Sequence, residues 1–571
     1  MKIRGVQIGD AVVRQDGAYK IQSRGYERIE KFLQDRRASL KHPKMWGTGA
    51  ATVGAAFLAS VAVGEHLDPL FAVFPDDTGT VQTKSSDPST LQISNSFFDP
   101  SIGTNDQACV TCHQPSIGIT ISVDFINQAF IHPNAHTGKL DHLFRTNDTA
   151  NNPHANSLSH NPADYSLILN LGVVRIGKTI PATADFAVVA ADAETNAMFA
   201  SPETFPLMQD PQHPAVPSLS VFRRPLLNTN VNFDSAVLWD GRANISNMPA
   251  QVQGAIQTLL LGAGTDSTVN QSIADFMTGV FTDQKSSNVA GELTALGATG
   301  GVHNLLTLSQ SPSRSCVFDE DTPPDLTPFV AAVATPTSCR PVVVGGQIVG
   351  GPPTFTLFDS WAKLPNTPAN AGRLSIARGQ AVFNTARGLD DEGNVIGCVF
   401  CHTVPNLGNN ASAGADGFKR IGTDSLDILR ATQVKPTPGS AEFQMMEDMI
   451  DRVSQLPLYC LRPKSDSTPG ACGTHAADVL TTDPGRALVT GHIADAGMFK
   501  PPILRDLAVR SPYFHAGAAQ DIEHLINFYN LRFGFGLTGG TNRSGQLHRH
   551  KFVAGFTFCS CSRVGQRDRG C

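Results

Sequence analysis

Apolar residues recur at helical spacing in two segments of the second half of the chain. The segment 374–383 is apolar at positions 374, 376, 377, 381, 382 and 383, and the segment 521–529 places Ile522, Leu525, Ile526 and Tyr529 on one face. An apolar stripe with a period near 3.6 residues is typical of an amphipathic helix. We therefore expect helices over both segments.

The N-terminal region carries a different hydrophobic pattern. Residues 45–64 contain no charged side chain, and they follow the basic residues Arg36, Arg37, Lys41 and Lys44. A basic flank before an apolar stretch predicts an export signal or an uncleaved membrane anchor. A buried helix rich in Ala and Gly is the third alternative. Residues 1–64 are thus expected to form a leader, and any membrane contact is expected through residues 45–64.

Polar segments rich in Pro, Gly, Ser and Thr divide the rest of the chain. Residues 65–100 are expected to form a linker, and residues 310–369 an insertion or connector. Between and after them lie two longer units, 101–309 and 370–538. Residues 539–571 turn basic and rich in cysteine, lose all periodicity and form an irregular tail.

Composition narrows the class of protein. The 571 residues are 41% hydrophobic, include 32 Phe and carry a net charge of −6. This profile excludes a coiled coil or a disordered chain, and no long basic run indicates nucleic acid.

Two C-x-x-C-H motifs use four of the eleven cysteines. They are Cys109-Val110-Thr111-Cys112-His113 and Cys398-Val399-Phe400-Cys401-His402. In such a motif both thiols add to the vinyl groups of a haem, and the histidine ligates its iron. A redox dithiol and a zinc half-site are the alternatives, but a zinc site would place its two Cys-x-x-Cys pairs closer to each other in the sequence. The two motifs predict two covalently bound haem c groups.

Seven cysteines remain outside these motifs. Cys316 and Cys339 flank one loop, and Cys460 and Cys472 flank another, so either pair can form a disulfide in an oxidising compartment. An odd number is left over, which leaves at least one thiol free or paired elsewhere.

Between the two motifs, Trp239-Asp240-Gly241-Arg242-Ala243 matches a known signature. Together with the haem motifs, it resembles the bacterial di-haem cytochrome c peroxidase and MauG superfamily over residues 105–537. The resemblance implies that Trp239 carries electrons between two haems and that Arg242 belongs to a haem pocket. Gln251 matches a glutamine of the family and is expected in the same pocket.

The C-terminal part carries two further matches. The segments 504–508 and 511–517 resemble a family region that lies against the second haem, which assigns Arg505 and His515 to its pocket. The family's distal ligand to that haem follows this histidine by fourteen residues, and here the position is Tyr529. A tyrosine ligand implies the MauG-like branch, because a phenolate stabilises oxidised iron more than a thioether does.

Three positions depart from the family pattern. Leu261 falls where peroxidases place a catalytic glutamate, and no carboxylate follows before Asp266, so the capacity for peroxide cleavage is in question. The family binds calcium through an asparagine fifteen residues before the tryptophan, where this chain has Arg224. Calcium stays open, because Asn228 lies nearby.

No histidine stands at the spacing of the family's removable distal ligand to the first haem. His132, His136, His154 and His160 follow the first motif, and they are expected to be loop residues. We therefore expect a five-coordinate first haem with His113 as its proximal ligand, open to peroxide or O₂. His402 and Tyr529 are expected to hold a six-coordinate second haem.

These patterns together predict a mainly α protein of two cytochrome c-like domains, each with one haem c and loop-rich insertions. The expected function is a periplasmic di-haem oxidoreductase that reacts with hydrogen peroxide and takes electrons from a small redox protein or an organic donor. A rubber-oxygenase-type enzyme that uses O₂ is the first alternative, and the Leu259–Leu261 run favours it. A non-catalytic electron-transfer protein is the second.

Overall fold

The computed structural model describes most of the chain between residues 73 and 535. The described residues are 73–87, 92, 94–132, 141–145, 148–151, 160–190, 218–234, 236–309, 342–344, 347–349, 356–386, 388–390, 395–402, 407, 418–426, 432–466, 468, 470, 472–473 and 475–535. All of them belong to one compact unit that begins at Asp68, whereas the leader with residues 45–64 lies outside the described residues. Within the described part, no helix has the length and apolar character needed to cross a membrane.

The expectation of a mainly α fold is wrong. About 40% of the described residues are helical and 18% lie in strands, which form several small sheets. The largest has four strands in the order β1-β2-β8-β9, namely Val73–Asp76, Gly79–Ser85, Val280–Ser287 and Gly291–Glu292. Strands β1 and β2 fall inside the segment expected to be a linker.

Polar residues on the buried face explain why this sheet was not predicted. Strand β2 alternates strictly between buried and half-buried positions, but its buried residues include Thr83 and Ser85 beside Val81. The Thr83 hydroxyl shares a hydrogen bond of 2.9 Å with that of Thr282 on β8. Cross-strand hydroxyl pairs satisfy a buried polar face, so an apolar alternation never appears in the sequence.

A three-stranded sheet joins the two halves of the chain. Its order is β15-β14-β4, and β14 lies antiparallel to both neighbours, so a strand from before the connector pairs with one from after it. The strands of this sheet and of the two-stranded sheets are β4 Phe186–Ala190, β14 Tyr459–Pro463, β15 Val479–Thr481, β3 Val174–Thr179, β5 Ser218–Arg223, β6 Ala236–Val237, β7 Ala243–Asn244, β10 Val342–Val344, β11 Gln347–Val349, β12 Gly388–Leu389 and β13 Val395–Ile396.

The two helices expected from periodicity are confirmed. Helix α10 spans Ala371–Thr385, and α15 spans Ile522–Phe533 with Asp521 accepting the N-terminal hydrogen bond from the His524 amide. The other described α-helices are α3 Cys109–Cys112, α4 Val123–Ile131, α5 Ser166–Leu171, α7 Met248–Thr258, α8 Ser267–Gly279, α9 Val302–Ser309, α11 Cys398–Cys401, α13 Ala441–Val453 and α14 Ala487–Thr490.

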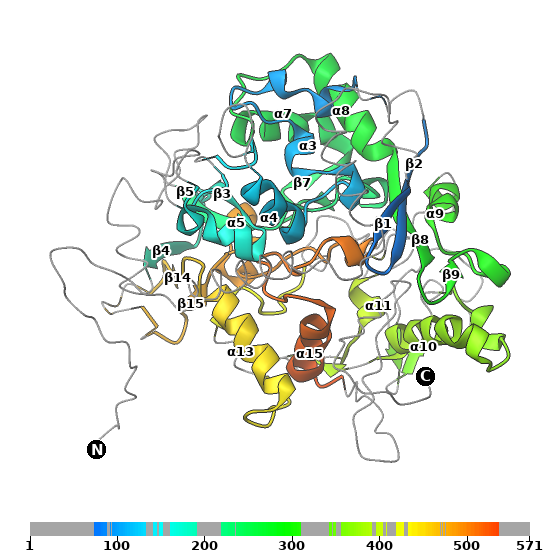
Figure 1. Ribbon diagram of the computed structural model, residues 1–571. Coiled ribbons are helices and arrows are strands. Elements are labelled where there is room, and N and C mark those ends of the chain that lie inside the picture. Colours follow the sequence, from blue (N-terminus) through cyan, green and yellow to red (C-terminus); the bar gives the residue numbers. More distant parts are fainter. Residues whose placement is uncertain are drawn as a thin grey trace, which may run out of the picture. The chain divides into compact units, whose positions relative to one another are not determined.

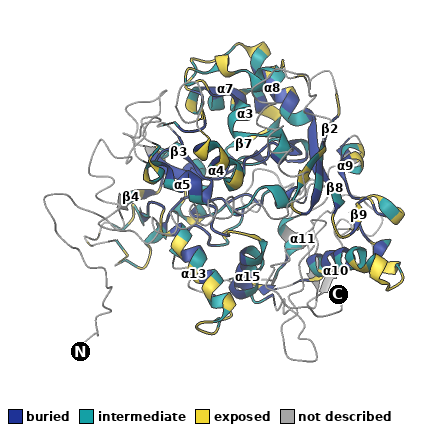
Figure 2. Ribbon diagram, viewed as in Figure 1, coloured by how far each residue is buried: buried dark blue, intermediate teal, exposed yellow. Residues whose placement is uncertain are grey.

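Two apolar clusters surround the two C-x-x-C-H motifs. Helices α7 and α8 lie side by side (Figure 1) and pack with Cys109 and Val110 of the first motif. Helices α10, α13 and α15 pack with Cys398 of the second motif, and their inner faces are buried (Figure 2). Each motif therefore lies against a core of its own.

One of the two expected disulfide pairs is present. Cys460 and Cys472 are bonded, with their Cα atoms 6.1 Å apart. Cys316, Cys339 and the three cysteines of the tail lie outside the described residues.

Candidate functional site

The first motif forms a single helical turn that ends at its histidine. Helix α3 contains both cysteines, and the Thr111 hydroxyl accepts a hydrogen bond of 3.1 Å from the Ala108 amide. The His113 ring lies with Nδ1 3.1 Å from the Ile119 carbonyl oxygen. A carbonyl at Nδ1 fixes the tautomer and leaves Nε2 for a metal.

The second motif repeats this arrangement. Helix α11 contains Cys398 and Cys401, and His402 follows with Nδ1 2.9 Å from the Leu407 carbonyl oxygen. Burial lowers the pKa of both His113 and His402 to about 4. Both imidazoles are therefore neutral at physiological pH, which is the form that ligates a metal.

The four motif cysteines are free thiols. Burial raises the pKa of Cys109 to about 12, and it raises the pKa of Cys112 and Cys401 as well. A redox dithiol instead needs a lowered thiol pKa and an electropositive setting. Among the described residues, the one group with metal-ligand proximity is Cys460, Cys472 and Asp478, and its two cysteines are joined in a disulfide. The four motif cysteines therefore fit neither a thiol-redox site nor a zinc site well.

Each motif opens into its own cavity. The first cavity is lined by Cys109, Cys112 and His113, and counting its open mouth it holds about 2220 Å³ of space free of protein atoms. The second cavity is lined by Cys398, Cys401, His402 and Tyr529 and holds about 1510 Å³ in the same sense. Each C-x-x-C-H histidine therefore lies on the wall of an open cavity.

Trp239 lines both cavities. Its indole Nε1 donates a hydrogen bond of 2.8 Å to the Arg224 carbonyl, and its own carbonyl accepts one of 2.8 Å from the Lys500 amide. Ring and backbone are thus both held in place. The structure brings the sequence-predicted tryptophan to the wall that separates the two motifs.

A buried ion cluster holds the turn that follows Trp239. Arg223 donates to Asp240 at 2.6 Å and, through two nitrogens, to Asp483 at 2.6 and 2.9 Å. The neighbouring guanidinium groups of Arg242 and Arg223 hold the pKa of the Asp240 carboxyl far below its usual range. Gly241 has a φ of +62°, and a Cβ there would lie 2.2 Å from the Phe418 ring. The Asp-Gly-Arg sequence is therefore required by this turn.

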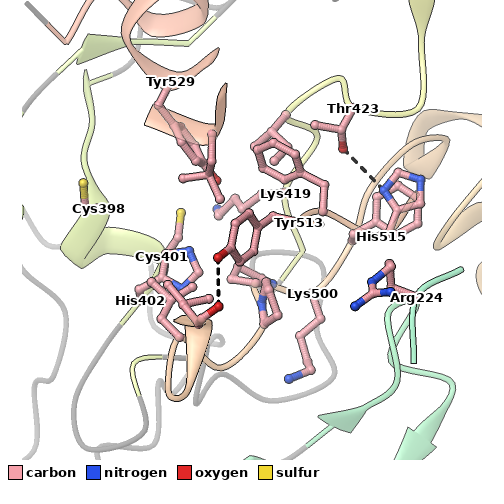
Figure 3. Close-up of a pocket in the computed structure, with 18 of the residues that line it drawn as sticks. Arg224, Cys398, Cys401, His402, Lys419, Thr423, Lys500, Tyr513, His515 and Tyr529 are labelled. Carbon is pink, nitrogen blue, oxygen red and sulfur yellow. Dashed lines mark hydrogen bonds between the residues drawn. The ribbon is translucent and has the colours of Figure 1, made fainter. Parts of the chain in front are cut away.

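Tyr529 reaches the second cavity from helix α15, and its ring extends toward Cys401 (Figure 3). Its ring lies among Phe514, Phe533 and Phe535, with centroids 5.9, 5.9 and 6.1 Å away. Burial raises the pKa of the phenol well above its ordinary value, and the nearby Cys401 and Cys398 raise it further. Without a cation in the cavity the phenol is neutral, and a bound metal would reverse this preference.

His515 lines the second cavity beside Trp239. Its ring stacks on Phe499 at a centroid distance of 3.9 Å and meets Trp239 edge-on at 6.1 Å. Nδ1 lies 3.3 Å from the Thr423 hydroxyl (Figure 3), and Nε2 is buried without a hydrogen bond among the described residues. Burial lowers the pKa of His515 to about 4, so the ring is neutral. A buried nitrogen without a partner beside a cavity indicates that a polar group belongs there.

The structure places two of the other predicted pocket residues in the first cavity. Arg242 and Gln251 both line it, and Arg242 donates to both oxygens of Asp240 at 2.9 Å. Arg505 lies elsewhere: it lines neither cavity and is buried with a hydrogen bond of 2.5 Å to Asp283. A buried guanidinium needs a carboxylate partner, and Asp283 draws Arg505 away from the predicted pocket.

The wall of the first cavity is apolar where peroxidases place glutamate. Leu259 and Leu260 line it, whereas Leu261 is exposed and does not. Asp266 lies at the N-terminus of α8, where it accepts hydrogen bonds from the amides of Thr268 and Val269. No carboxylate of the 251–266 segment therefore reaches this cavity.

Three charged residues of the first cavity were missed from the sequence. Asp148, Arg175 and Lys178 line it, and Oδ1 of Asp148 is buried without a hydrogen bond. Burial raises the pKa of Asp148 to about 7, and burial together with Arg242 lowers that of Lys178 to about 7. Asp148 lies in a polar loop and the other two in β3, and none belongs to a motif. Cationic side chains around the cavity match the propionate groups of a haem.

The remaining expected positions lie elsewhere or stay undescribed. His132 ends helix α4 on the surface, and neither it nor His160 lines a cavity. His136 and His154 lie outside the described residues. Asn228 lines the first cavity, and the Arg224 guanidinium donates to three backbone carbonyls rather than to any carboxylate among the described residues.

No protein-family model matches this chain, and no curated protein is similar to it in sequence. The case for its function therefore rests on the residues and their geometry.

Proposed function

We propose that the chain is a di-haem c-type oxidoreductase of the cytochrome c peroxidase and MauG type. The observation that carries this proposal is the tryptophan that lines two cavities at once, each with its own C-x-x-C-H turn. In both turns a backbone carbonyl holds Nδ1 of the histidine, as expected for an iron ligand. A single haem site would not require this duplication.

The first cavity is the proposed reaction site. His113 would hold the iron of a haem bound there, and this haem would supply the redox chemistry for hydrogen peroxide or O₂. Arg175, Lys178 and Arg242 would hold the propionate groups by charge, and Leu259 and Leu260 would exclude water from the open face.

Asp148 is the residue best suited to move protons in this cavity. Its carboxyl has an oxygen without a partner, and its pKa near 7 suits a group that both gives and takes a proton at neutral pH. Reduction of hydrogen peroxide to two waters consumes two electrons and two protons. In this proposal Asp148 takes over the proton transfer for which the family uses a glutamate.

The second cavity is the proposed store and relay of electrons. His402 and Tyr529 would both hold a haem bound here, and the phenol group would supply a ligand that favours oxidised iron. Trp239 would pass electrons between the cavities, because it lines both of them and its indole Nε1 is held by the Arg224 carbonyl. A small redox protein or an organic molecule is the proposed electron donor.

An exported, periplasmic location goes with this proposal. The Cys460–Cys472 disulfide supports it, because disulfides persist in oxidising compartments. The apolar leader segment 45–64 is the proposed export signal or anchor.

One observation favours a second function, that of a haem-dependent oxygenase acting on an apolar substrate with O₂. The first cavity carries Met248, Val252, Leu259, Leu260 and Met277 on its wall. Such a lining suits a hydrocarbon-like substrate better than a small polar one. The identity of the co-substrate separates this function from peroxidase activity.

The deciding experiment counts and classifies the haems of the purified protein. We expect two haems per chain by pyridine haemochrome assay, and one in each of the double variants C109A/C112A and C398A/C401A. The double variant C460A/C472A is the matched control, because it also removes two cysteines but should retain both haems. A protein without covalently bound haem would contradict the proposal.

The same preparation tests reactivity. In the diferric wild type we expect one high-spin EPR signal, from the first site, that disappears after one equivalent of hydrogen peroxide. Two low-spin signals that peroxide leaves unchanged would contradict peroxidase activity of the oxidised protein. Consumption of O₂ with an apolar substrate, without any reaction with peroxide, would favour the oxygenase.

A further inference from the structure

Arg224 is a buried cation that lines both cavities and has no anionic partner among the described residues. Its side chain is about 5% exposed, and its guanidinium donates to the carbonyl oxygens of Gly172 at 3.0 Å, Ile121 at 2.8 Å and Arg510 at 3.0 Å. No carboxylate of the described residues pairs with it. Buried charges are usually paired with an opposite charge, so three converging carbonyls are an uncommon solution.

The three carbonyls come from three separate segments of the chain, and of the three residues only Arg510 lines the cavities. Ile121 follows the first C-x-x-C-H motif by a short loop, and Gly172 ends helix α5. Arg510 lies just before the segment that carries His515. A cation at the C-terminal end of a helix is favoured by the helix dipole, so Arg224 ties this end of α5 to both halves of the site.

The backbone of Arg224 holds the residues that separate the cavities. Its carbonyl accepts the hydrogen bond from Trp239 Nε1 at 2.8 Å, and its amide donates to the His515 carbonyl at 2.7 Å. Figure 3 shows the Arg224 side chain near the ring of His515. The position of Arg224 therefore fixes where the indole of Trp239 hydrogen bonds.

The surrounding chain is shaped around the guanidinium. Gly172 has a φ of +63°, and a Cβ there would lie 1.8 Å from Nη1 of Arg224. Burial and the nearby guanidinium groups of Arg510 and Arg452 lower the pKa of Arg224 to about 9, which still leaves it charged at neutral pH. A neutral side chain would leave three buried carbonyls without a donor, at a cost for each of them.

We propose that Arg224 is a positioning residue, an internal cation that gathers three backbone carbonyls and thereby fixes Trp239 between the two cavities. The inference rests on the relay role proposed above for Trp239. It implies that this place needs no dissociable metal ion, because the guanidinium already takes the oxygens that such an ion would bind.

The role of the positive charge at position 224 is tested by comparing the variants R224K and R224M of the holoprotein. Lysine retains a cation with three donors, whereas methionine has a similar length and no charge. We expect R224K to retain at least half of the electron-transfer rate between the two sites, and R224M to lose about tenfold or more. Equal rates in the two variants would overturn the proposal.

The position of Trp239 is read separately by ultraviolet resonance Raman spectroscopy. The tryptophan N–H band of the wild type minus that of W239F isolates the hydrogen bond to Arg224. We expect this band to shift in R224M and to remain in R224K. The control variant is R420A, because Arg420 also donates to two backbone carbonyls, those of Ala494 and Ala496, but lines neither cavity. An unshifted band in R224M would overturn the proposal.

A chelator tests the wild type without any substitution. We expect EDTA to leave the melting temperature, the Trp239 band and the electron-transfer rate unchanged. A loss that Ca²⁺ restores would show a dissociable metal and overturn the proposal. If W239F transfers electrons as fast as the wild type, the relay role fails, whereas the Raman band still decides whether Arg224 positions the indole.

Discussion

The two cavities share one design at the histidine and differ on the remaining walls. In both, a C-x-x-C-H turn ends at an imidazole whose Nδ1 faces a backbone carbonyl. The first cavity then adds charged side chains and aliphatic ones, and no tyrosine lines it among the described residues. The second adds Tyr529 and four phenylalanines. The shared part would hold a haem, and the difference would decide what that haem does.

This difference follows from which elements close each cavity. Helix α7 and strand β3 form part of the wall of the first cavity and provide amide, aliphatic and cationic side chains. Helix α15 closes the second cavity and provides a phenol within an aromatic cluster. The proposed reactivity of the first site and the proposed storage of charge at the second should therefore respond to separate substitutions.

The largest effect is expected from Tyr529→Phe. Loss of the phenol removes the proposed sixth ligand, so the second haem should become high-spin and its reduction potential should rise by on the order of 100 mV. EPR spectroscopy and a spectroscopic redox titration measure both changes. The first haem should remain as it is, which would sharpen the contrast between the cavities.

Tyr513→Phe is the matched control for this change. Tyr513 lines the same cavity, but its hydroxyl donates at 2.8 Å to the Leu507 carbonyl instead of facing a metal. Its loss should leave the spin state of the second haem unchanged. If both variants gave the wild-type spectrum, Tyr529 would not be a ligand.

Next in size is the effect of Trp239→Phe. Electron transfer between the two sites should slow by roughly tenfold or more, equivalent to about 1.4 kcal/mol of barrier. Flash photolysis of the half-reduced protein measures this rate, and the spectra of both haems should stay unchanged. Trp361→Phe serves as control, because Trp361 lies in the core, where its Nε1 donates a hydrogen bond to the Ala295 carbonyl. Equal slowing in both variants would indicate a general loss of stability.

The residues of the two cavities were predictable from sequence to different extents. Both C-x-x-C-H turns, Trp239 and Tyr529 belong to motifs or fixed spacings, and the structure brings each of them to a cavity wall. Asp148 has no such signal, because a carboxylate in a polar loop is usually solvated. Arg505 was assigned to a pocket by its motif, but it pairs with the buried carboxylate of Asp283 and lines neither cavity.

The sheets could not be predicted from the sequence pattern for a related reason. Strands β2 and β8 are separated by nearly two hundred residues, and their inner face pairs Thr83 with Thr282. Strand β4 finds its partner β14 across the connector. Such pairings depend on tertiary contacts that local periodicity does not report. In helices α10 and α15 the apolar residues recur one helical turn apart in the sequence. The bounds of both helices were therefore predicted to within a few residues.

A smaller effect is expected from Asp148→Asn, and it should change only the first cavity. Burial raises the pKa of Asp148 to about 7, so the carboxyl is protonated below that pH and charged above it. The rate of the wild type with peroxide should fall by about threefold to tenfold as the pH rises through 7. In the variant this dependence should vanish, and stopped-flow measurements across pH 5–9 check it.

The pH dependence of stability gives an independent test of the raised pKa of Asp148. Because the folded-state pKa lies above the unfolded value of 3.8, the folded protein binds the proton more tightly between about pH 4 and 7. The free energy of unfolding should therefore fall as the pH rises through this window, by about 4 kcal/mol at most. Asp266→Asn is the control, because Asn also caps a helix. A pH profile of Asp148→Asn identical to that of the wild type would contradict a role for Asp148.

The smallest effects are expected from two threonines, one beside each cavity. The Thr423 hydroxyl lies 3.3 Å from Nδ1 of His515. In the first motif, the Thr111 hydroxyl accepts a hydrogen bond of 3.1 Å from the Ala108 amide. Because each valine variant loses one ordinary hydrogen bond, each should lower the free energy of unfolding by about 0.5–1.5 kcal/mol. Spectra should separate them: Thr423→Val should alter only the second haem and Thr111→Val only the first. If either change altered both haems equally, the two cavities would behave as one coupled site, and the division into a reactive and a storage haem would fail.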